Sequence, residues 1–177
     1  MQLSYRLLSG VLFLASVIGM TFALYLEHVQ GLAPCPLCVF QRVGLIALGL
    51  VSLIAFVHNP KSNVVKRIYA LLGSIGILWS VGVAARHVWL QNLPPDQVPS
   101  CGPGLDYLVD ALPMKAVLQQ VLSGSGECAV IDWTFLGQSL PVWSLFFFSV
   151  LALISLWQLL RNYPFVASAT FGKVKKK

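Results

Sequence analysis

Four runs of apolar residues dominate the chain, and the charged residues lie between these runs. No Asp, Glu, Lys or Arg interrupts residues 7–26, 68–85 or 142–160. Each of these runs approaches the ~20 residues that a helix needs to cross a hydrocarbon core ~30 Å thick. They therefore predict three transmembrane helices.

The fourth apolar run, residues 43–57, lies between Arg42 and His58 and is short for a span. Taken alone, it could be a buried or re-entrant segment. The distribution of charge along the chain decides between these interpretations.

Basic and acidic residues occupy different segments. Nine of the twelve basic residues stand in three segments without any acid: Arg6, Lys61, Lys66, Arg67, Arg161, Lys173, Lys175, Lys176 and Lys177. All six acids stand in the other two: Glu27, Asp96, Asp106, Asp110, Glu127 and Asp132. The positive-inside rule assigns the basic segments to the cytoplasm, which requires the short run to cross as well. Both termini are then cytoplasmic.

We therefore predict one all-α membrane domain, a four-transmembrane-helix bundle with two outer loops, the second of which carries a short interfacial helix. The predicted spans are residues 7–26, 41–57, 68–88 and 142–160. The predicted outer loops are residues 27–40 and 89–141, and the cytoplasmic segments are residues 1–6, 58–67 and 161–177. A cleaved signal peptide is not favoured, because no A-x-A site follows the first run and that run is long enough to span.

Composition agrees with a membrane protein. Hydrophobic residues make up 57% of the 177 residues and charged residues 10%, with a mean hydropathy of +0.78. A soluble domain carries ~25% charged residues, so a soluble or disordered chain is excluded. The net charge of +6 fits lysines that meet anionic lipid of the bilayer, and we expect no nucleic-acid partner.

The four cysteines all lie in the predicted outer loops. Cys35 and Cys38 form a Cys-Pro-Leu-Cys motif in the first loop, and Cys101 and Cys128 lie in the second. Disulfides persist outside the cytoplasm, so these four cysteines can form two disulfides. A disulfide that closes so short a loop would contribute little to the stability of the fold, which favours a redox role for the first pair. Structural zinc usually takes two closely spaced pairs, so we predict no metal site.

The residues around the motif point to the start of a helix. Pro34 and Pro36 favour an extended chain followed at once by a helix, which would place Cys38 in its first turn. The helix dipole there favours a thiolate. Arg42 follows four residues later on the same face, about one turn deeper. An arginine at this depth can extend to the headgroups, but an intramembrane charge more often serves function.

The second cysteine pair lies among glycine, serine and proline residues, which suit a mobile loop. Between the two cysteines apolar residues recur at helical spacing: Met114, Val117, Leu118, Val121 and Leu122. This pattern fits a helix on the membrane surface or, equally well, a helix packed onto the other loop.

Thiol–disulfide exchange can move electrons between the two pairs, but it cannot carry them across the membrane because no cysteine lies in a span or on the cytoplasmic side. The chain has three histidines and no G-x-G-x-x-G motif, so nothing indicates haem or flavin. A lipid-dissolved two-electron carrier that reaches Cys38 is the simplest acceptor, and quinone fits this description. Arg42 could then stabilise negative charge on a quinone oxygen.

Three motifs together resemble the bacterial disulfide bond formation protein B (DsbB) family over nearly the whole chain. They are Pro34-Cys35-Pro36-Leu37-Cys38-Val39-Phe40-Gln41-Arg42, Cys101-Gly102-Pro103-Gly104, and Ser125-Gly126-Glu127-Cys128-Ala129 followed by Trp133 and Phe135-Leu136-Gly137. The resemblance implies a multi-pass protein of the bacterial inner membrane with periplasmic loops. It also implies an enzyme that oxidises protein dithiols with quinone.

What the resemblance implies for the residues is a relay of electrons. A periplasmic thioredoxin-fold thiol oxidase, DsbA-like, would attack Cys101 and displace Cys128, which would then attack Cys35. Cys38 would reduce ubiquinone or menaquinone, and Arg42 would assist quinone binding. His87 matches a family position near the quinone.

Two alternatives remain at this stage. A vitamin K epoxide reductase-like enzyme also joins an outer-loop cysteine pair to a Cys-x-x-Cys motif, but that family usually has the two in the reverse order. A non-catalytic membrane scaffold would use both disulfides only to hold its loops.

Overall fold

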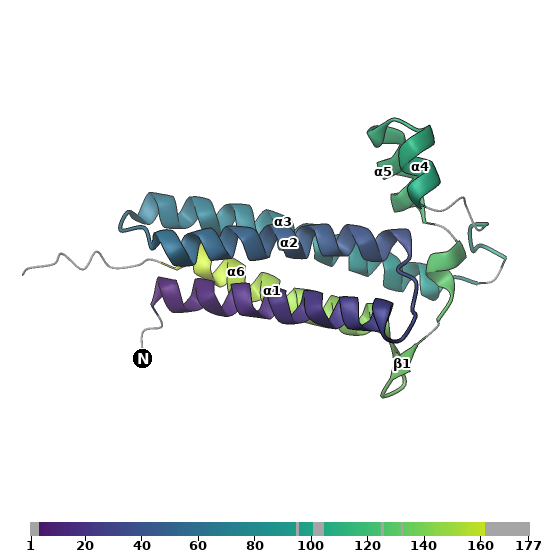
Figure 1. Cartoon of the computed structure of the whole chain (residues 1–177), viewed down its shortest axis with the longest axis horizontal. Coiled ribbons are helices and arrows are strands. Elements are labelled where there is room, and N and C mark those ends of the chain that lie inside the picture. The colour runs from purple at the N-terminus through teal and green to yellow at the C-terminus, as the bar shows by residue number, and fades with distance from the viewer. Residues whose placement is uncertain (1–3, 95, 101–104, 125, 132, 162–177) are drawn as a thin grey trace, which may run out of the picture.

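Four long helices run side by side in the computed structural model, which describes residues 4–94, 96–100, 105–124, 126–131 and 133–161 (Figure 1). These helices are α1 (Tyr5–His28), α2 (Pro36–His58), α3 (Asn63–Gln91) and α6 (Leu140–Leu160). Each is long and apolar enough to cross a membrane. The predicted four-helix membrane bundle is therefore confirmed.

Local sequence signals set the helix ends. The Ser4 hydroxyl oxygen accepts a hydrogen bond from the Leu7 amide and caps α1. Helix α2 ends at His58. Its C-cap residue Asn59 has a φ of 43°, in the left-handed region that Asn tolerates, and Pro60 follows it. The turn to α3 is short, so α2 and α3 are antiparallel neighbours.

Helix α2 begins at Pro36, earlier than the predicted start of the second span at residue 41. Proline is favoured at the first helical position because its missing N–H would have no partner there. The predicted helix start, with Cys38 in the first turn, agrees with α2. The span boundary at residue 41 concerns the membrane and stays a prediction. With the helix start at Pro36, the short run becomes a helix able to cross a membrane.

The bundle core combines large apolar side chains with close helix contacts. Its buried residues include Leu12, Leu45, Leu48, Ile77, Phe148 and Leu151. Helices α2 and α3 approach closely at Gly44, where an added Cβ would overlap the Gly76 carbonyl oxygen and the Ser80 hydroxyl. Small residues allow such approach in membrane bundles, where packing rather than hydrophobicity holds helices together.

Two hydrogen bonds between buried polar side chains join helices of the bundle. The Ser74 and Ser155 hydroxyl oxygens lie 2.9 Å apart and join α3 to α6. The Gln158 amide donates to the Ser9 hydroxyl at 2.9 Å and joins α6 to α1. Polar groups in the hydrocarbon region need such partners, since no water is available there.

The outer surface of the spans is apolar. Large side chains on all four long helices are exposed, among them Leu14, Ile18, Ile54, Leu72, Ile75, Leu153 and Leu160. Soluble proteins rarely expose so much contiguous apolar surface, whereas lipid covers such a surface favourably. The exposed face therefore suits contact with lipid chains.

The segment between α3 and α6 forms a small cap on one end of the bundle (Figure 1). It contains α4 (Leu105–Ala111), α5 (Met114–Ser123), the 3₁₀ helix η1 (Gly126–Ala129) and the antiparallel strands β1 (Thr134–Phe135) and β2 (Gln138–Ser139). The sequence predicts one helix here, α5. The additional helix α4 is too short to produce a recognisable periodic pattern.

Helix α5 packs on the bundle with one face. Val117 and Val121 are buried in a cluster with Leu37 of α2 and Leu90 of α3. The sequence left open a helix on the membrane surface and a helix packed onto the other loop. The contact of these two valines with Leu37, a residue of the predicted first loop, agrees with the second interpretation. The opposite end of the helix carries an exposed Met114.

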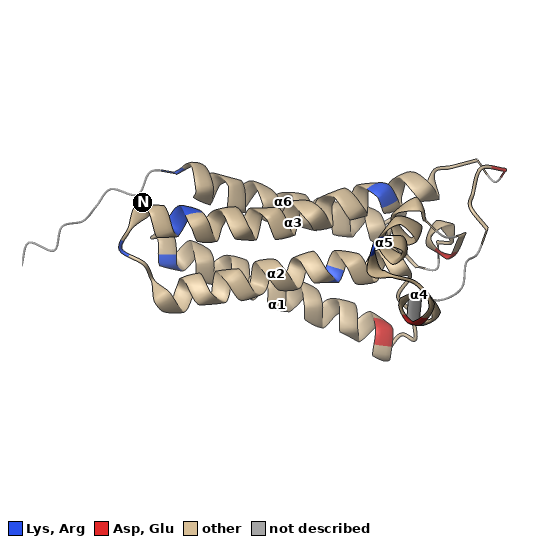
Figure 2. Ribbon diagram, turned by 90° about the horizontal axis from the view of Figure 1, so that it is seen from above, with Lys and Arg blue, Asp and Glu red and all other residues tan. Residues whose placement is uncertain are grey.

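Charge is divided between the two ends of the bundle (Figure 2). Among the described residues, most Lys and Arg residues gather at the end that carries the N-terminus, and the Asp and Glu residues lie at the other end with the cap. Three other basic residues lie toward the cap end: Arg42 near the start of α2, Arg86 near the end of α3 and Lys115 in α5. The three-dimensional arrangement thus retains the charge asymmetry that the positive-inside rule uses.

Replacing Gly44 with Ala should destabilise the bundle by about 2 kcal/mol, because the new methyl group forces α2 and α3 apart. The measurement is reversible unfolding of the purified protein in mixed micelles. Gly82→Ala on α3 is the matched control, since nothing lies within 4 Å of its added Cβ. That control should be as stable as the wild type or more so. Equal stability of the Gly44 variant would show that the close contact is not important.

Candidate functional site

Cys35 and Cys38 lie at the cap end of the bundle, where α2 begins. Cys35 is the N-cap residue, and its Sγ accepts a hydrogen bond from the Cys38 amide at 3.4 Å. Both side chains are half-buried thiols, and their Sγ atoms lie 3.0 Å apart. A disulfide requires ~2.05 Å, so a movement of ~1 Å closes the bond. The pair is positioned to alternate between dithiol and disulfide.

His87 of α3 contacts both sulfurs of this pair. It is buried, with Nε2 3.8 Å from Cys35 Sγ and Nδ1 3.9 Å from Cys38 Sγ. The Gln41 side-chain amide lies 3.3 Å from Nδ1, and the Cys128 carbonyl oxygen lies 3.1 Å from Nε2. One imidazole therefore links the motif on α2 to the segment that carries Cys128.

Cys128 is buried in η1 against the top of the bundle. Its apolar neighbours belong to α2, α3, α4 and α5 and include Leu37, Leu90, Leu108 and Val121. Two residues before it, the Gly126 amide donates to the Ser100 carbonyl oxygen at 3.3 Å. Cys101, the remaining cysteine of the predicted site, lies outside the described residues.

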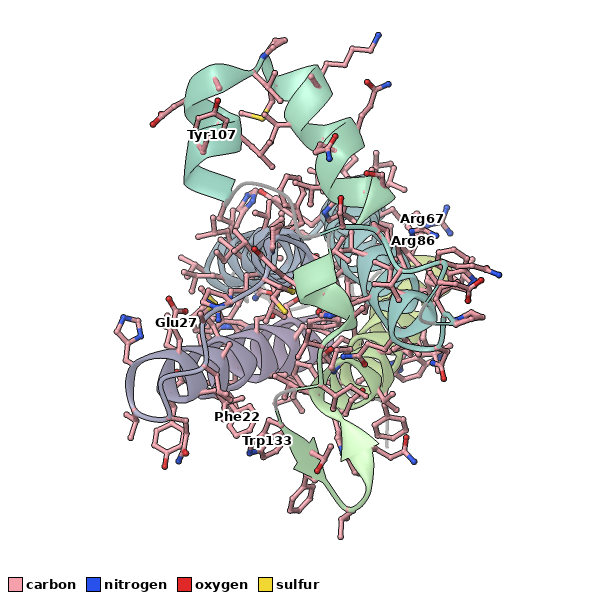
Figure 3. All side chains as sticks on the ribbon, turned by 90° about the vertical axis from the view of Figure 1, so that its right-hand side faces the viewer. Phe22, Glu27, Arg67, Arg86, Tyr107 and Trp133 are labelled. Atoms are coloured by element: carbon pink, nitrogen blue, oxygen red, sulfur yellow. The ribbon has the colours of Figure 1, made fainter. Side chains whose placement is uncertain are left out.

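Arg42 lies one turn deeper than Cys38 and forms an ion pair with Glu27 near the end of α1. Glu27 is labelled in Figure 3. A second guanidinium nitrogen, Nη2, donates to the Ala23 carbonyl oxygen at 3.4 Å. The two charged side chains are 17% and 28% exposed. A charge at this depth needs such a partner, and the pair joins α1 to α2.

A cavity of about 540 Å³ lies beside these residues, between α1, α2, α6 and the β hairpin. Its lining is mostly apolar, with Phe22 on the α1 side and Trp133 on the hairpin side (Figure 3). Cys38, Arg42 and His87 are among the few polar groups that reach it. Small-molecule sites typically combine this size, an apolar wall and a few converging polar groups.

Aromatic rings form one wall of the cavity. The rings of Trp133, Phe135, Trp143 and Phe146 follow one another with centroid separations of 6.0, 5.9 and 6.5 Å. The Trp143 indole N–H donates to the Phe135 carbonyl oxygen at 3.0 Å, which ties the hairpin to α6. A wall of this kind suits a flat, apolar ring.

The donor atoms of Cys35, Cys38 and His87 lie within 4.8 Å of one another, which is close enough to hold a metal ion. Both ring nitrogens of His87 already face other partners, however. Two thiols with one imidazole also make fewer ligands than the four of a structural zinc site. The expectation of no metal site therefore stays a prediction.

Four membrane-spanning helices, with a dithiol at the start of one of them beside an apolar cavity, define a membrane-embedded thiol–disulfide oxidoreductase. The profile of the family described as "Disulfide bond formation protein DsbB" matches residues 5–158, and the chain belongs to this family. It is therefore a disulfide-forming oxidoreductase and a multi-pass membrane protein. This assignment favours the resemblance to the disulfide bond formation protein B family over the vitamin K epoxide reductase-like alternative.

Curated relatives match this chain over nearly their whole length. A protein named disulfide bond formation protein B from Acinetobacter baumannii is 74% identical over 169 residues, which cover 96% of this chain and 99% of the relative. Its namesake from Acinetobacter baylyi is 73% identical, covering 95% and 98%. A more distant one from Stutzerimonas stutzeri is 47% identical, covering 90% and 97%.

Sequence reasoning assigned no role to two residues that the structure brings into the site, Glu27 and Gln41. A signal existed for each. Glu27 is an acid at the end of one span, and Arg42 is a base at the start of the next, so the two could have been paired. Gln41 stands three residues after Cys38 and therefore on the same helix face.

The Glu27–Arg42 ion pair should contribute about 1 kcal/mol to stability, because both side chains are partly exposed. A double-mutant cycle of Glu27→Ala and Arg42→Ala, read out by unfolding in mixed micelles, measures this coupling. As a control, Glu27→Ala combined with Arg6→Ala should be additive, since Arg6 lies over Phe56 at the other end. Additivity in the Glu27–Arg42 cycle would show that the pair contributes nothing.

Proposed function

We propose that this protein reoxidises a periplasmic, DsbA-like thiol oxidase of thioredoxin fold and passes the electrons to quinone in the membrane. The observation that carries the proposal is the position of Cys38. Its thiol reaches the apolar cavity that lies among membrane-spanning helices, and Arg42 reaches the same cavity. A thiol in this place can meet an oxidant that is dissolved in lipid.

The proposed orientation has both termini in the cytoplasm and the cap in the periplasm of a bacterium, with the spans in the inner membrane. Support comes from the separation of basic and acidic residues between the two ends. The cysteines then lie in the oxidising compartment, where a soluble dithiol partner can reach the cap.

Electrons would enter through the second cysteine pair. A thiolate of the partner would attack Cys101 in a Cys101–Cys128 disulfide, and Cys128 would leave as a thiolate. Cys128 would then attack Cys35 in the Cys35–Cys38 disulfide and release Cys38 as a thiolate. The second thiol of the partner would displace Cys101, and the Cys101 thiolate would re-form the Cys101–Cys128 bond and release Cys35, so that Cys35 and Cys38 are both reduced. The link from His87 to both Cys35 and the Cys128 carbonyl supports this route, because it holds the Cys128 segment close to the first pair.

Ubiquinone or menaquinone would accept the electrons at the cavity. Quinone takes up two electrons and two protons to become quinol, and the substrate dithiol becomes a disulfide. Arg42 would stabilise the negative charge that develops on a quinone oxygen. His87 reaches the same cavity, but both ring nitrogens already have protein partners, so we propose that it contacts quinone through its ring carbons.

Cys38→Ser and Cys101→Ser should each lower the rate of quinone-dependent oxidation of the reduced partner by roughly 100-fold or more, because each removes one sulfur from the relay. The assay follows quinone absorbance with purified protein, quinone and a reduced thioredoxin-fold dithiol protein. Ser123→Ala, a change on the surface of α5, is the control and should retain activity. Full turnover in both cysteine variants would favour the scaffold interpretation.

Arg42→Ala should raise the apparent KM for quinone about tenfold, since a hydrogen bond to a charged group contributes ~1.5–3 kcal/mol. Attack of the partner on Cys101 should persist, and trapping of the mixed disulfide measures it. Arg86→Ala is the matched control, because Arg86 lies at the same end but donates to the Leu122 and Ser123 carbonyl oxygens. An unchanged KM in the Arg42 variant would remove Arg42 from the quinone site.

A further inference from the structure

The two nearest partners of His87 indicate which of its ring nitrogens carries a proton. The sulfurs of Cys35 and Cys38 lie farther away, at 3.8 and 3.9 Å. The Cys128 carbonyl oxygen can only accept a hydrogen bond, so Nε2, at 3.1 Å, must be the donor. In a neutral ring Nδ1 is then an acceptor, and it needs a donor opposite it. The Gln41 amide nitrogen, at 3.3 Å, is that donor.

Gln41 is fixed in place from two directions. Its side chain is buried, and its backbone carbonyl oxygen accepts a hydrogen bond from the Ser80 hydroxyl on α3 at 2.7 Å. The close approach of α2 and α3 at Gly44, three residues further on, leaves little room for relative movement of the two helices. The amide of Gln41 is therefore held at a defined position opposite the His87 ring.

We propose that Gln41 is a positioning residue that holds His87 in the neutral tautomer with the proton on Nε2. In this tautomer the ring donates to the Cys128 carbonyl and docks the Cys128 segment against Cys35 and Cys38. The inference rests on the proposed relay, because docking matters only if Cys128 exchanges with the motif.

The step that this docking serves balances within the chain. The Cys128 thiolate attacks Cys35 Sγ, the Cys35–Cys38 bond breaks and a Cys35–Cys128 bond forms. The electron pair and the negative charge leave on Cys38 Sγ. No oxidant or reductant from outside is needed for this step, so its rate reports on the geometry of the bridge.

A glutamate at position 41 would have nearly the same shape but the opposite hydrogen-bonding character. A carboxylate only accepts, so it would require the proton on Nδ1. The neutral ring would then turn the lone pair of Nε2 toward the Cys128 carbonyl oxygen, which is repulsive. Gln41→Glu should therefore undock the segment, although it changes the size of the side chain very little.

The tautomer can be measured directly in the full-length protein in lipid nanodiscs. The chain has only three histidines, so ¹⁵N-histidine labelling gives three ring systems, and His87→Asn identifies the one from His87. Long-range ¹H–¹⁵N correlation distinguishes a proton on Nε2 from one on Nδ1. We expect the Nε2–H pattern in the wild type and its loss in Gln41→Glu. Gln41→Leu removes the donor opposite Nδ1 but leaves the Cys128 carbonyl, so we expect a mixture of the two tautomers there.

Gln158 provides a matched control. It is 3% exposed, compared with 5% for Gln41, and it donates to Ser9 in the same bundle. Gln158→Glu and Gln158→Leu test the general cost of changing a buried amide. They should leave the His87 pattern unchanged, and the signals of the other two histidines report whether each variant is folded.

The second measurement is the single-turnover rate of exchange between the two cysteine pairs. Loss of one hydrogen bond of the bridge should slow it about fivefold to tenfold in both Gln41 variants, with the KM for quinone changed less than about twofold. An Nδ1–H pattern in the wild type, or an Nε2–H pattern retained in both Gln41 variants, would overturn the proposal. A wild-type protein that fails to reduce quinone would instead refute the proposed function, while the tautomer measurement would still decide the role of Gln41.

Discussion

The start of helix α2 determines the geometry of the whole cap end of the bundle. Because Pro36 takes the first helical position, Cys38, Gln41 and Arg42 follow at spacings of three and four residues and share one side of the helix. From this side Gln41 reaches His87 on α3, and Arg42 reaches Glu27 on α1. A shift of the helix start by one residue would rotate these side chains by ~100° and separate them from their partners.

Polar groups are costly at this depth unless they are paired, and the bundle pairs those that it places beside the cavity. Glu27 neutralises Arg42, while Gln41 and the Cys128 carbonyl occupy both nitrogens of His87. These contacts leave the remaining wall apolar and aromatic, which suits a molecule that arrives from lipid. A site of this kind can connect thiol chemistry in water with an oxidant in the membrane without any redox group that crosses the bilayer.

The sequence predicts the spans well because lipid demands long apolar runs and charge asymmetry distinguishes the two sides. The placement of Cys38 and Arg42 on one face of a helix, beside the same cavity, could also be predicted from their spacing. The prolines around the motif also predict the start of α2, with Cys38 in its first turn. Helix α4 is too short to show a periodic pattern. The Gln41–His87 contact depends on how α2 and α3 meet in space, which spacing along one segment does not reveal.

The central claim is that electrons taken from thiols at the cap leave through a lipid-dissolved two-electron carrier. Its most direct test is the stoichiometry of quinol formation, measured anaerobically with the purified protein in quinone-loaded nanodiscs and a reduced thioredoxin-fold partner. The account predicts one quinol for every partner disulfide formed, and none without the partner. Anaerobic oxidation of the partner without quinol formation would contradict it.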